Sequence, residues 1–507
     1  MSRRPARRRG VVLPIVLAVV VLLSLAIYGF AEATVTERAF VARQVAAAQA
    51  RQAALSAVDR TLAVMTDAEF DPLDLAAYEG LFDGPVFVAD DETPAPSFRV
   101  VVPDFFEDEP FLWAGPRGES GKIDLNALAS SSLTLQEQRA VLLAVPEMTD
   151  TLADTILDFI DGDATPREYG TESDDGDFLV RNAPLRTLDD LAAIPDIDAF
   201  LLYGEDANRN GVLDVAEDDG DVRLPLDDAD GVLWPGWREY VTVSGREAVL
   251  SPDGEPLIDV NALDAAGEQA LATAVGADVA EFILAYLENG PAESGSEDVS
   301  TSAAGTSGRA SPLLNASPLP DQSDQNGGNA ALRSIYELVD ARVEVTVSRR
   351  GPTEVLTSPW SSADLTAADE AYALLVTSSA ESAAGRIDLN FASVETLLGL
   401  PGMTESIAAE IVDGAGVWQA PGNLVTAGVV DFETFLRFAP FVTTRGGVFR
   451  FQAVGRPPRA DGLPVARFEA VIDLTTSPPR IVRLDDLTRL GRGYTDESLP
   501  AWTSEPE

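Results

Sequence analysis

An uninterrupted apolar stretch near the N-terminus constrains this chain more than any other feature. Residues 11–30 contain no charged side chain, and the ten residues before them carry five arginines. At about 1.5 Å per helical residue, a stretch of this length spans roughly the 30 Å of a hydrocarbon core. Because arginine-rich flanks stay on the cytoplasmic side, the sequence predicts one transmembrane helix with everything after Phe30 beyond the membrane.

The helical pattern continues past the apolar stretch. Residues 32–65 contain no glycine or proline and are rich in alanine, glutamine and arginine, which favour helix. We therefore expect residues 31–68 to extend the transmembrane helix as an amphipathic rod. The alternative is a cleavable signal peptide. The apolar region of a signal peptide is about 7 to 15 residues long and is followed by small residues at the cleavage site. The apolar stretch of this chain is longer, and residues 28–33 match such a cleavage site only loosely.

The charge balance excludes several classes of function. The 507 residues include 83 acidic and 36 basic side chains, for a net charge of −47, and contain no histidine and no cysteine. The acidic excess repels phosphate, so no nucleic-acid partner is expected. The lack of histidine and cysteine excludes Ser-His-Asp and Cys-His catalysis, zinc sites built on these residues, and disulfides. A hydrolase that uses two carboxylates stays possible, because Asp and Glu are abundant, but no specific spacing indicates one, and we expect the chain not to be an enzyme.

A spacing typical of an EF-hand calcium loop covers residues 206–217. The oxygen-bearing positions of that loop are filled, and Gly211 occupies the position of its sharp turn. Such a loop offers a hard divalent cation the roughly six or seven oxygen ligands that it needs. The sequence thus predicts a structural Ca²⁺ site with the ligands Asp206, Asn208, Asn210, Val212 (through its carbonyl), Asp214 and Glu217. The alternative is a solvated acidic turn.

Two further acidic groups are weaker candidates. The first is either a second cation site or a polar loop, and it comprises Asp161, Asp163, Glu172, Asp174, Asp175 and Asp177. The second is interpreted as a set of turn residues, and it comprises Asp227, Asp228 and Asp230.

A short motif occurs three times after residue 120. Each copy predicts a short strand that leads into a helix, with an Asp or Asn able to cap that helix. The copies are Gly121–Ala127, Leu257–Ala262 and Gly385–Ala392. Two of them are followed by predicted helical hairpins, at residues 142–161 and 397–414, with Thr149 and Thr404 as the N-caps of the second helices.

Stretches of alternating hydrophobicity predict antiparallel strands on both sides of the helical blocks, and hence an α+β fold. The predicted strands are residues 97–103, 342–347, 448–454, 465–474 and 480–484. The predicted divisions are a leader (1–10), a transmembrane helix (11–30), its extension (31–68), strands (69–120), a helical insert with the calcium loop (121–290), a flexible linker (291–328), a helix and strand (329–350), a second helical block (351–441), and closing strands with a tail (442–507).

The N-terminal features resemble those of the type IV pilin-like proteins, in which a prepilin peptidase cuts after a glycine and leaves the apolar helix in place. The resemblance places this cut between Gly10 and Val11 and implies a methylated amine on the mature chain. The fifth mature position, usually glutamate in the family, is Ile15. Among type II secretion pseudopilins, the K-type minor pseudopilin lacks this glutamate and carries helical inserts described as tandem sterile-alpha-motif-like domains, so the chain is most similar to that type.

This resemblance implies a function and a location. A K-type minor pseudopilin caps the tip of the periplasmic pseudopilus and aids secretion of folded proteins. The chain would have a pilin-like antiparallel sheet and would stand in the periplasm on a single inner-membrane helix. The implied partners are the prepilin peptidase and the minor pseudopilins of the I and J types, which would meet this chain along a coiled-coil-like seam at residues 34–65.

Two other functions stay open. One is a membrane-anchored DNA-uptake receptor that uses the hairpins as helix-hairpin-helix motifs. Acidic residues surround the hairpin turns Pro146–Thr149 and Pro401–Thr404, and neither turn has the second glycine of a phosphate-binding hairpin, which disfavours that reading. The other is a signal-anchored, calcium-dependent surface protein.

Overall fold

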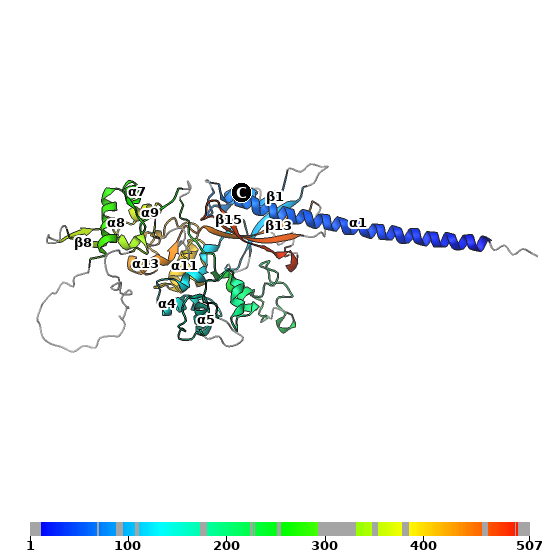
Figure 1. Ribbon diagram of the computed structural model, residues 1–507, viewed down its shortest axis with the longest axis horizontal. Coiled ribbons are helices and arrows are strands. Elements are labelled where there is room, and N and C mark those ends of the chain that lie inside the picture. The colour runs from blue at the N-terminus through cyan, green and yellow to red at the C-terminus, as the bar shows by residue number, and fades with distance from the viewer. Residues whose placement is uncertain are drawn as a thin grey trace, which may run out of the picture.

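A computed structural model describes most of the chain. The described residues are 12–67, 70–87, 95–106, 111–172, 180–223, 227, 229–250, 255–292, 331–346, 353–377, 385–458, 465–491 and 493–494. The predicted processing site at Gly10 and Val11 lies outside them, as does all of the predicted linker except residues 291–292. Figure 1 shows one long helix that projects from a body in which a sheet and several groups of helices lie side by side.

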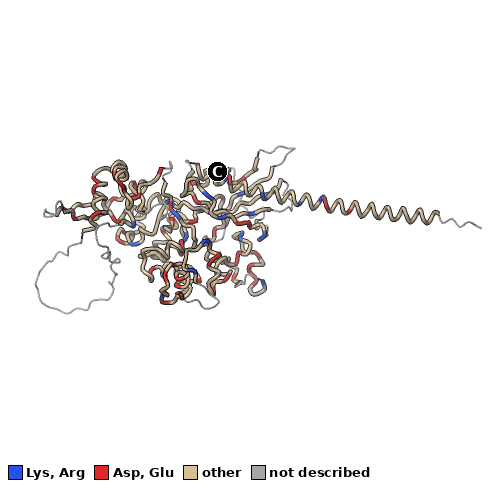
Figure 2. Tube along the Cα trace, in the orientation of Figure 1, with Lys and Arg blue, Asp and Glu red and all other residues tan. Residues whose placement is uncertain are grey.

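The projecting element is helix α1, which runs unbroken over the 54 residues Val12–Met65. Its most apolar window has a mean hydropathy of 2.7 and is not buried by any part of the folded body. Helix α1 is the one described helix that is long and apolar enough to cross a membrane. Figure 2 shows that the projecting part is nearly uncharged, whereas acidic side chains are spread over the body. The predicted continuity of residues 11–30 with 31–68 is confirmed from residue 12 to residue 65.

An antiparallel sheet holds the second half of α1. Its path is β1-β2-β13-β14-β15, with β3 beside β2 and β4 beside β13. The strands are β1 (Asp83–Pro85), β2 (Ser97–Asp104), β3 (Phe111–Ala114), β4 (Arg117–Gly118), β13 (Val448–Arg456), β14 (Ala466–Asp473) and β15 (Arg480–Asp486). The antiparallel strands predicted near 97–103, 448–454, 465–474 and 480–484 are confirmed, because segments more than 300 residues apart pair within this one sheet.

The two faces of this sheet differ in chemistry. Alternate residues of β13 and β14, such as Phe451 and Phe468, pack against the alanines of α1. At Gly455 the sheet comes so close to α1 that a Cβ there would overlap the backbone of Ala50 and Ala54. The opposite face carries Arg450 and other polar side chains, which are nevertheless buried under the helical part of the chain.

The packing of α1 corrects the seam predicted at residues 34–65. Between Ala46 and Met65 the small-residue face of the helix is buried against this chain's own sheet. That face is therefore unavailable to a second helix. Apart from half-buried Thr34, residues 12–45 are exposed, so in this half no face of the helix is covered by the described part of the chain.

The three repeated motifs open three helical modules. Each module begins with two strand residues that pair in parallel with two residues at its end. These pairs are β5 (Ile123–Asp124) with β6 (Val241–Thr242), β7 (Ile258–Asp259) with β10 (Leu375–Val376), and β11 (Ile387–Asp388) with β12 (Val442–Thr443). The middle module therefore joins residues 258–289 to residues 331–376, across the divisions expected at 290, 328 and 350.

The asparagine of the repeated motif makes the same kind of hydrogen bonds in every module. It hydrogen-bonds to the backbone of a residue much later in the module, through both its amide nitrogen and its amide oxygen. The pairs are Asn126 with Leu185, Asn261 with Leu332, and Asn390 with Trp418, at 2.7 to 3.2 Å. Because these residue pairs are buried or half-buried, each asparagine fixes a loop that would otherwise carry unpaired backbone groups.

The helices of the modules share one large apolar core. The first module contains α3 (Leu125–Ala129), α4 (Leu135–Leu143), α5 (Asp150–Ile160), the 3₁₀ helices η3 (Leu188–Ala193), η4 (Gly220–Val222) and η5 (Trp237–Glu239), and α6 (Ala199–Tyr203). The middle module contains α7 (Ala265–Val275), α8 (Ala277–Asn289), η7 (Ile335–Leu338), α9 (Thr366–Tyr372) and the hairpin of β8 (Arg342–Thr346) with β9 (Thr353–Thr357). The third contains α10 (Val394–Leu398), α11 (Glu405–Asp413), α12 (Asn423–Thr426), α13 (Phe432–Phe438) and η8 (Ala439–Phe441).

The two predicted hairpins are present. They are formed by α4 with α5 and by α10 with α11, and Thr149 and Thr404 cap the second helix of each. The short helix η2 (Glu119–Gly121) precedes the first module, and η1 (Leu75–Tyr78), α2 (Glu79–Phe82) and η9 (Leu487–Leu490) complete the described helices of the sheet region.

Candidate functional site

The predicted calcium loop lies between α6 and η4 and folds around the carboxylate of Asp206. The two oxygens of that carboxylate accept hydrogen bonds from the backbone amides of Asn210, at 2.9 Å, and Gly211, at 2.7 Å. The Asn210 side-chain oxygen accepts from the amide of Val212 at 2.8 Å. Gly211 has a φ of 71°, which permits the sharp turn that lets the chain wrap around Asp206.

Glu217 closes the loop from its far end. Its two carboxylate oxygens accept hydrogen bonds from the amides of Asn208, at 3.2 Å, and Asp214, at 3.1 Å. The Asp214 carboxylate accepts from the side-chain nitrogens of Asn208, at 2.6 Å, and Asn210, at 3.3 Å. The structure thus brings together all five side chains that were predicted as ligands.

The electrostatics of the loop fit a divalent cation. Asp206 and Glu217 are 5% and 4% exposed, and no basic side chain forms an ion pair with either among the described residues. Burial raises the pKa of Glu217 to about 7 and also raises the pKa of Asp206. The side-chain oxygen of Asn208 is buried without a hydrogen-bond partner in the described part of the chain. Buried carboxylates and an unpaired amide oxygen suit Ca²⁺, which binds only oxygen and would supply the missing positive charge.

A second acidic group forms between the end of α5 and the segment that follows it. One carboxylate oxygen from each of Asp158, Asp161 and Glu172 lies within 4.8 Å of the other two. Asp161 Oδ1 and both carboxylate oxygens of Glu172 are buried without hydrogen-bond partners in the described chain. Burial raises the pKa of all three groups, and that of Asp158 to about 7. This arrangement resembles a cation site, although Arg167 already pairs with Asp158 at 3.3 Å.

This second group differs in membership from the predicted one. Asp161 and Glu172 were predicted, whereas Asp158 was missed because it lies among the buried residues of an amphipathic helix. Its spacing of three residues before Asp161 puts both on one helical face, which was an available indication. Asp163 instead accepts the amide of Thr165 at 2.7 Å and closes a turn. Asp174, Asp175 and Asp177 lie outside the described residues.

The acidic residues near 230 form turns. Asp227 accepts the amides of Gly220, at 2.7 Å, and Ala229, at 2.9 Å. Asp230 accepts the amide of Val232 at 2.7 Å. These contacts agree with their interpretation as turn residues, and Asp228 lies outside the described residues.

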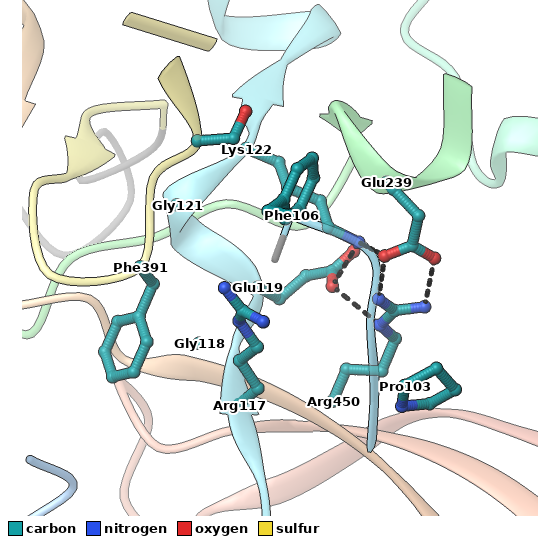
Figure 3. A pocket seen from close by; sticks show the side chains of 11 residues that line it. Pro103, Phe106, Arg117, Gly118, Glu119, Gly121, Lys122, Glu239, Phe391 and Arg450 are labelled. Atoms are coloured by element: carbon teal, nitrogen blue, oxygen red, sulfur yellow. Dashed lines mark hydrogen bonds and ion pairs between the residues drawn. The ribbon is translucent and has the colours of Figure 1, made fainter. Parts of the chain in front are cut away.

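A buried network of charges joins the sheet to the first module (Figure 3). Arg450 of β13 donates to Glu239 from both terminal nitrogens, at 2.8 Å for one of them, and its Nε lies 3.3 Å from Glu119. Lys122 lies 3.0 Å from Glu119. Burial works to raise the pKa of Glu239, but the positive charges of Arg450 and Lys122 outweigh it and hold that pKa at about 2.

The network continues along the sheet toward the calcium loop. Glu469 of β14 accepts from Arg238 at 2.8 Å, and Arg209 of the loop lies 3.8 Å from the same carboxylate. Sequence reasoning missed this network. The available indication was that β13 and β14 alternate apolar residues with charged or polar ones, but the alternation does not show that helices cover the polar face.

The hairpin turns show no phosphate-binding geometry. In the first turn Glu147 takes the left-handed conformation, with a φ of 60°, so an acidic residue stands where a phosphate-binding turn has glycine. In the second turn Gly402 has a φ of 82°, and Arg437 is the basic residue beside it. Both hairpins are therefore present, but neither of the described turns carries the two glycines of a phosphate-binding hairpin.

Comparison with known proteins gives one weak structural similarity. No family model matches the chain, and no curated protein matches it. A solved structure similar to it is the crystal structure of the GspK-GspI-GspJ complex from the enterotoxigenic Escherichia coli type 2 secretion system, at 12% sequence identity and a TM-score of 0.30, with 89% of this chain and 98% of that chain covered. A TM-score this low establishes no shared fold. The class that the structure itself defines is an α+β protein with a long apolar N-terminal helix set into an antiparallel sheet.

Proposed function

We propose that the chain is a minor pseudopilin of a type II secretion system, of the K type, that caps the tip of the periplasmic pseudopilus. The observation that carries this proposal is the form of α1. A single helix is bare and apolar in its first half and is built into an antiparallel sheet in its second half. A bare apolar helix requires lipid or other apolar helices around it, and a subunit of a helical fibre uses both in turn.

Processing and assembly follow from this form. The prepilin peptidase would cut between Gly10 and Val11 and leave α1 intact, with the folded body in the periplasm and the helix in the inner membrane. During assembly the membrane-spanning part of α1, up to Phe30, would leave the bilayer, and residues 12–45 would pack among the helices of sibling subunits, the I-type and J-type pseudopilins. Residues 46–65 keep their packing on the sheet, so the body need not rearrange.

The bulk of the modules supports a position at the tip. Figure 1 shows the middle module, with α7, α8 and β8, at the end of the molecule opposite the free end of α1. A subunit stacked above would have to occupy the space that these helices fill. The proposal is therefore that the chain, with its sterile-alpha-motif-like helical inserts, ends a fibre. The proposed Ca²⁺ in the 206–217 loop would have a structural role there, and no catalytic role is proposed.

The N-terminus of the mature protein tests this proposal. Mass spectrometry of the chain purified from membranes should find Val11 as the first residue, with a methylated amine. Gly10→Leu should abolish the cut, whereas Gly29→Leu should leave it unchanged, because Gly29 has open space around it within α1. A mature chain that begins after Phe30 would contradict the proposal and support a secreted or surface protein, and an unprocessed chain would also contradict it.

A further inference from the structure

The proposed calcium loop is bonded to the last described residues of the chain. Asn210 donates a hydrogen bond from its side-chain nitrogen to the carbonyl oxygen of Gly493 at 2.7 Å, although the two are 283 residues apart. The next residue, Tyr494, is 1% exposed and packs with Val101 and Val454 of the sheet. The segment Gly493–Tyr494 is therefore docked between the loop and the sheet.

A second connection runs through the backbone of Arg209. This residue has a φ of 57°, a conformation that non-glycine residues rarely adopt. Its carbonyl oxygen accepts hydrogen bonds from Gln452 at 2.8 Å and from Arg467 at 2.7 Å. Gln452 in turn accepts a hydrogen bond from the hydroxyl of Tyr494 at 2.7 Å, and the Arg467 guanidinium stacks over the Tyr494 ring at 4.8 Å.

These contacts are buried, so their loss would be costly. Arg467 is 0% exposed, and Gln452 is 2% exposed. If the loop lost its order, the Arg209 carbonyl and the Asn210 amide would move, and buried polar groups on the sheet would lose their partners. Gly493 has a φ of 72°, and a Cβ there would overlap the Arg467 guanidinium, so the segment fits against this arginine in one close arrangement.

We propose that divalent-cation binding to the 206–217 loop and docking of Gly493–Tyr494 are thermodynamically linked, so that Ca²⁺ clamps the C-terminal segment to the sheet. This inference rests on the calcium site of the proposed function. Asn210 is the link, because its side-chain oxygen is a ligand in the proposed site while its nitrogen holds Gly493. Linkage is reciprocal, so docking raises the calcium affinity by the same factor by which calcium favours docking.

Hydrogen exchange on the full-length chain in detergent tests the linkage directly. Measured by mass spectrometry, the peptide that contains Gly493 and Tyr494 should exchange at least about fivefold more slowly with Ca²⁺ than with a chelator. The β8–β9 hairpin, which lies in another module, should not change. Equal exchange of residues 493–494 under conditions where calcium binds would overturn the inference.

Two matched substitutions separate the clamp from the cation site. Asn208→Asp and Asn210→Asp each replace an amide by a carboxylate at an oxygen-bearing position of the loop, but only Asn210 contacts Gly493. Both variants should bind Ca²⁺. Asn208→Asp should keep the calcium-dependent protection of residues 493–494, whereas Asn210→Asp should lose most of it, and equal protection in the two would overturn the clamp.

A substitution of Tyr494 tests whether docking of the C-terminal segment raises the affinity of the loop for Ca²⁺. Tyr494→Phe removes the hydroxyl that reaches Gln452 and should weaken calcium binding about fivefold, measured by competition with a fluorescent chelator. Tyr286→Phe, at a buried tyrosine of α8, is the control and should leave the affinity unchanged. If the wild-type chain binds no Ca²⁺, both the clamp and the calcium site fail, while the pseudopilin proposal is decided separately by the mature N-terminus.

Discussion

Buried carboxylates of this protein fall into two groups whose pKa values move in opposite directions. Glu239 and Glu469 face arginines, which lower their pKa values in spite of burial. Glu217 has no ion-pair partner among the described residues and Asp158 has Arg167 at 3.3 Å, and burial raises the pKa of both carboxylates to about 7. Arginines therefore keep the first group ionised, whereas the second group takes up a proton more readily than an ordinary carboxylate.

The pH dependence of calcium stabilisation follows from Glu217. Its pKa rises from an ordinary 4.5 to about 7 in the folded chain. Without calcium, the folded state holds this proton more tightly than the unfolded state, so this group makes the fold less stable as pH rises from about 4.5 to 7. Calcium should offset that loss only where the carboxylate is ionised, so the melting temperature should rise with Ca²⁺ by about 2 °C or more at pH 8 and by less at pH 6.

Calorimetry with calcium and with a chelator at the two pH values measures this difference. Glu217→Gln should remove most of the calcium effect at pH 8. Glu433→Gln, at an exposed position of α13, is the control. An equal calcium effect at both pH values would count against Glu217 as a ligand.

The ion network predicts that removing one partner of a buried ion pair destabilises the fold more than removing both partners. Arg450→Met alone leaves the buried Glu239 without its main partner and should destabilise the fold by about 3–5 kcal/mol. Arg450→Met combined with Glu239→Leu should cost less than Arg450→Met alone, because it leaves fewer buried carboxylates without their partner. Denaturant unfolding of the two variants measures both values, and a double variant that is less stable than the single one would contradict this account.

Acid should destabilise the fold through this ion network, because the pKa of Glu239 is lower in the folded chain than in the unfolded chain. The pKa of Glu239 falls from 4.5 to about 2, so its contribution to stability is present above 4.5 and is lost as pH falls toward 2. Unfolding followed by circular dichroism should therefore show this loss between about pH 4.5 and 2. The Arg450→Met variant should show a smaller loss over the same range.

At the scale of elements, helix α1 and the sheet strands were predictable because their signals are local. An unbroken helical composition specifies α1, and alternation at period two specifies β2, β13, β14 and β15. The pairing of β7 with β10 was not predictable, since two residues on each side carry no pattern of their own and more than 100 residues separate them. The loop around Asp206 was predictable because its ligands all lie within residues 206–217 at a typical spacing, whereas Asp158 meets Glu172 only through the fold.

The contact between α1 and the sheet predicts the effect of one added side chain. Ala50 is 0% exposed and its backbone lies against Gly455, so Ala50→Leu should force α1 away from β13 and destabilise the fold by about 1–3 kcal/mol. Ala47→Leu adds the same volume on the exposed side of the helix and should have little effect. Denaturant unfolding in detergent compares the two, and equal stability would mean that the contact is loose.

At the scale of the whole molecule, three modules of one pattern are fused into a single core beside a small sheet. The asparagine contacts of Asn126, Asn261 and Asn390 recur although the helices between them differ in number and length. The sequence showed the three motifs but not that residues 258–376 form a module of their own, since its two halves lie on either side of a long polar segment.

The net charge of the molecule predicts its behaviour toward DNA. With a charge of −47 spread over the body (Figure 2), the chain should show no binding to a short DNA duplex tighter than about 100 µM, even at low salt. Fluorescence anisotropy measures this. Micromolar affinity that falls steeply with added salt would support a DNA-uptake receptor instead.

The unbroken course of α1 has a mechanical consequence. No described turn or bend separates the half of the helix that is free from the half that is embedded in the sheet. A force applied along the free end of the helix is therefore transmitted directly to the folded body. If the helix were moved out of a lipid bilayer along its axis, the whole body would move by the same distance.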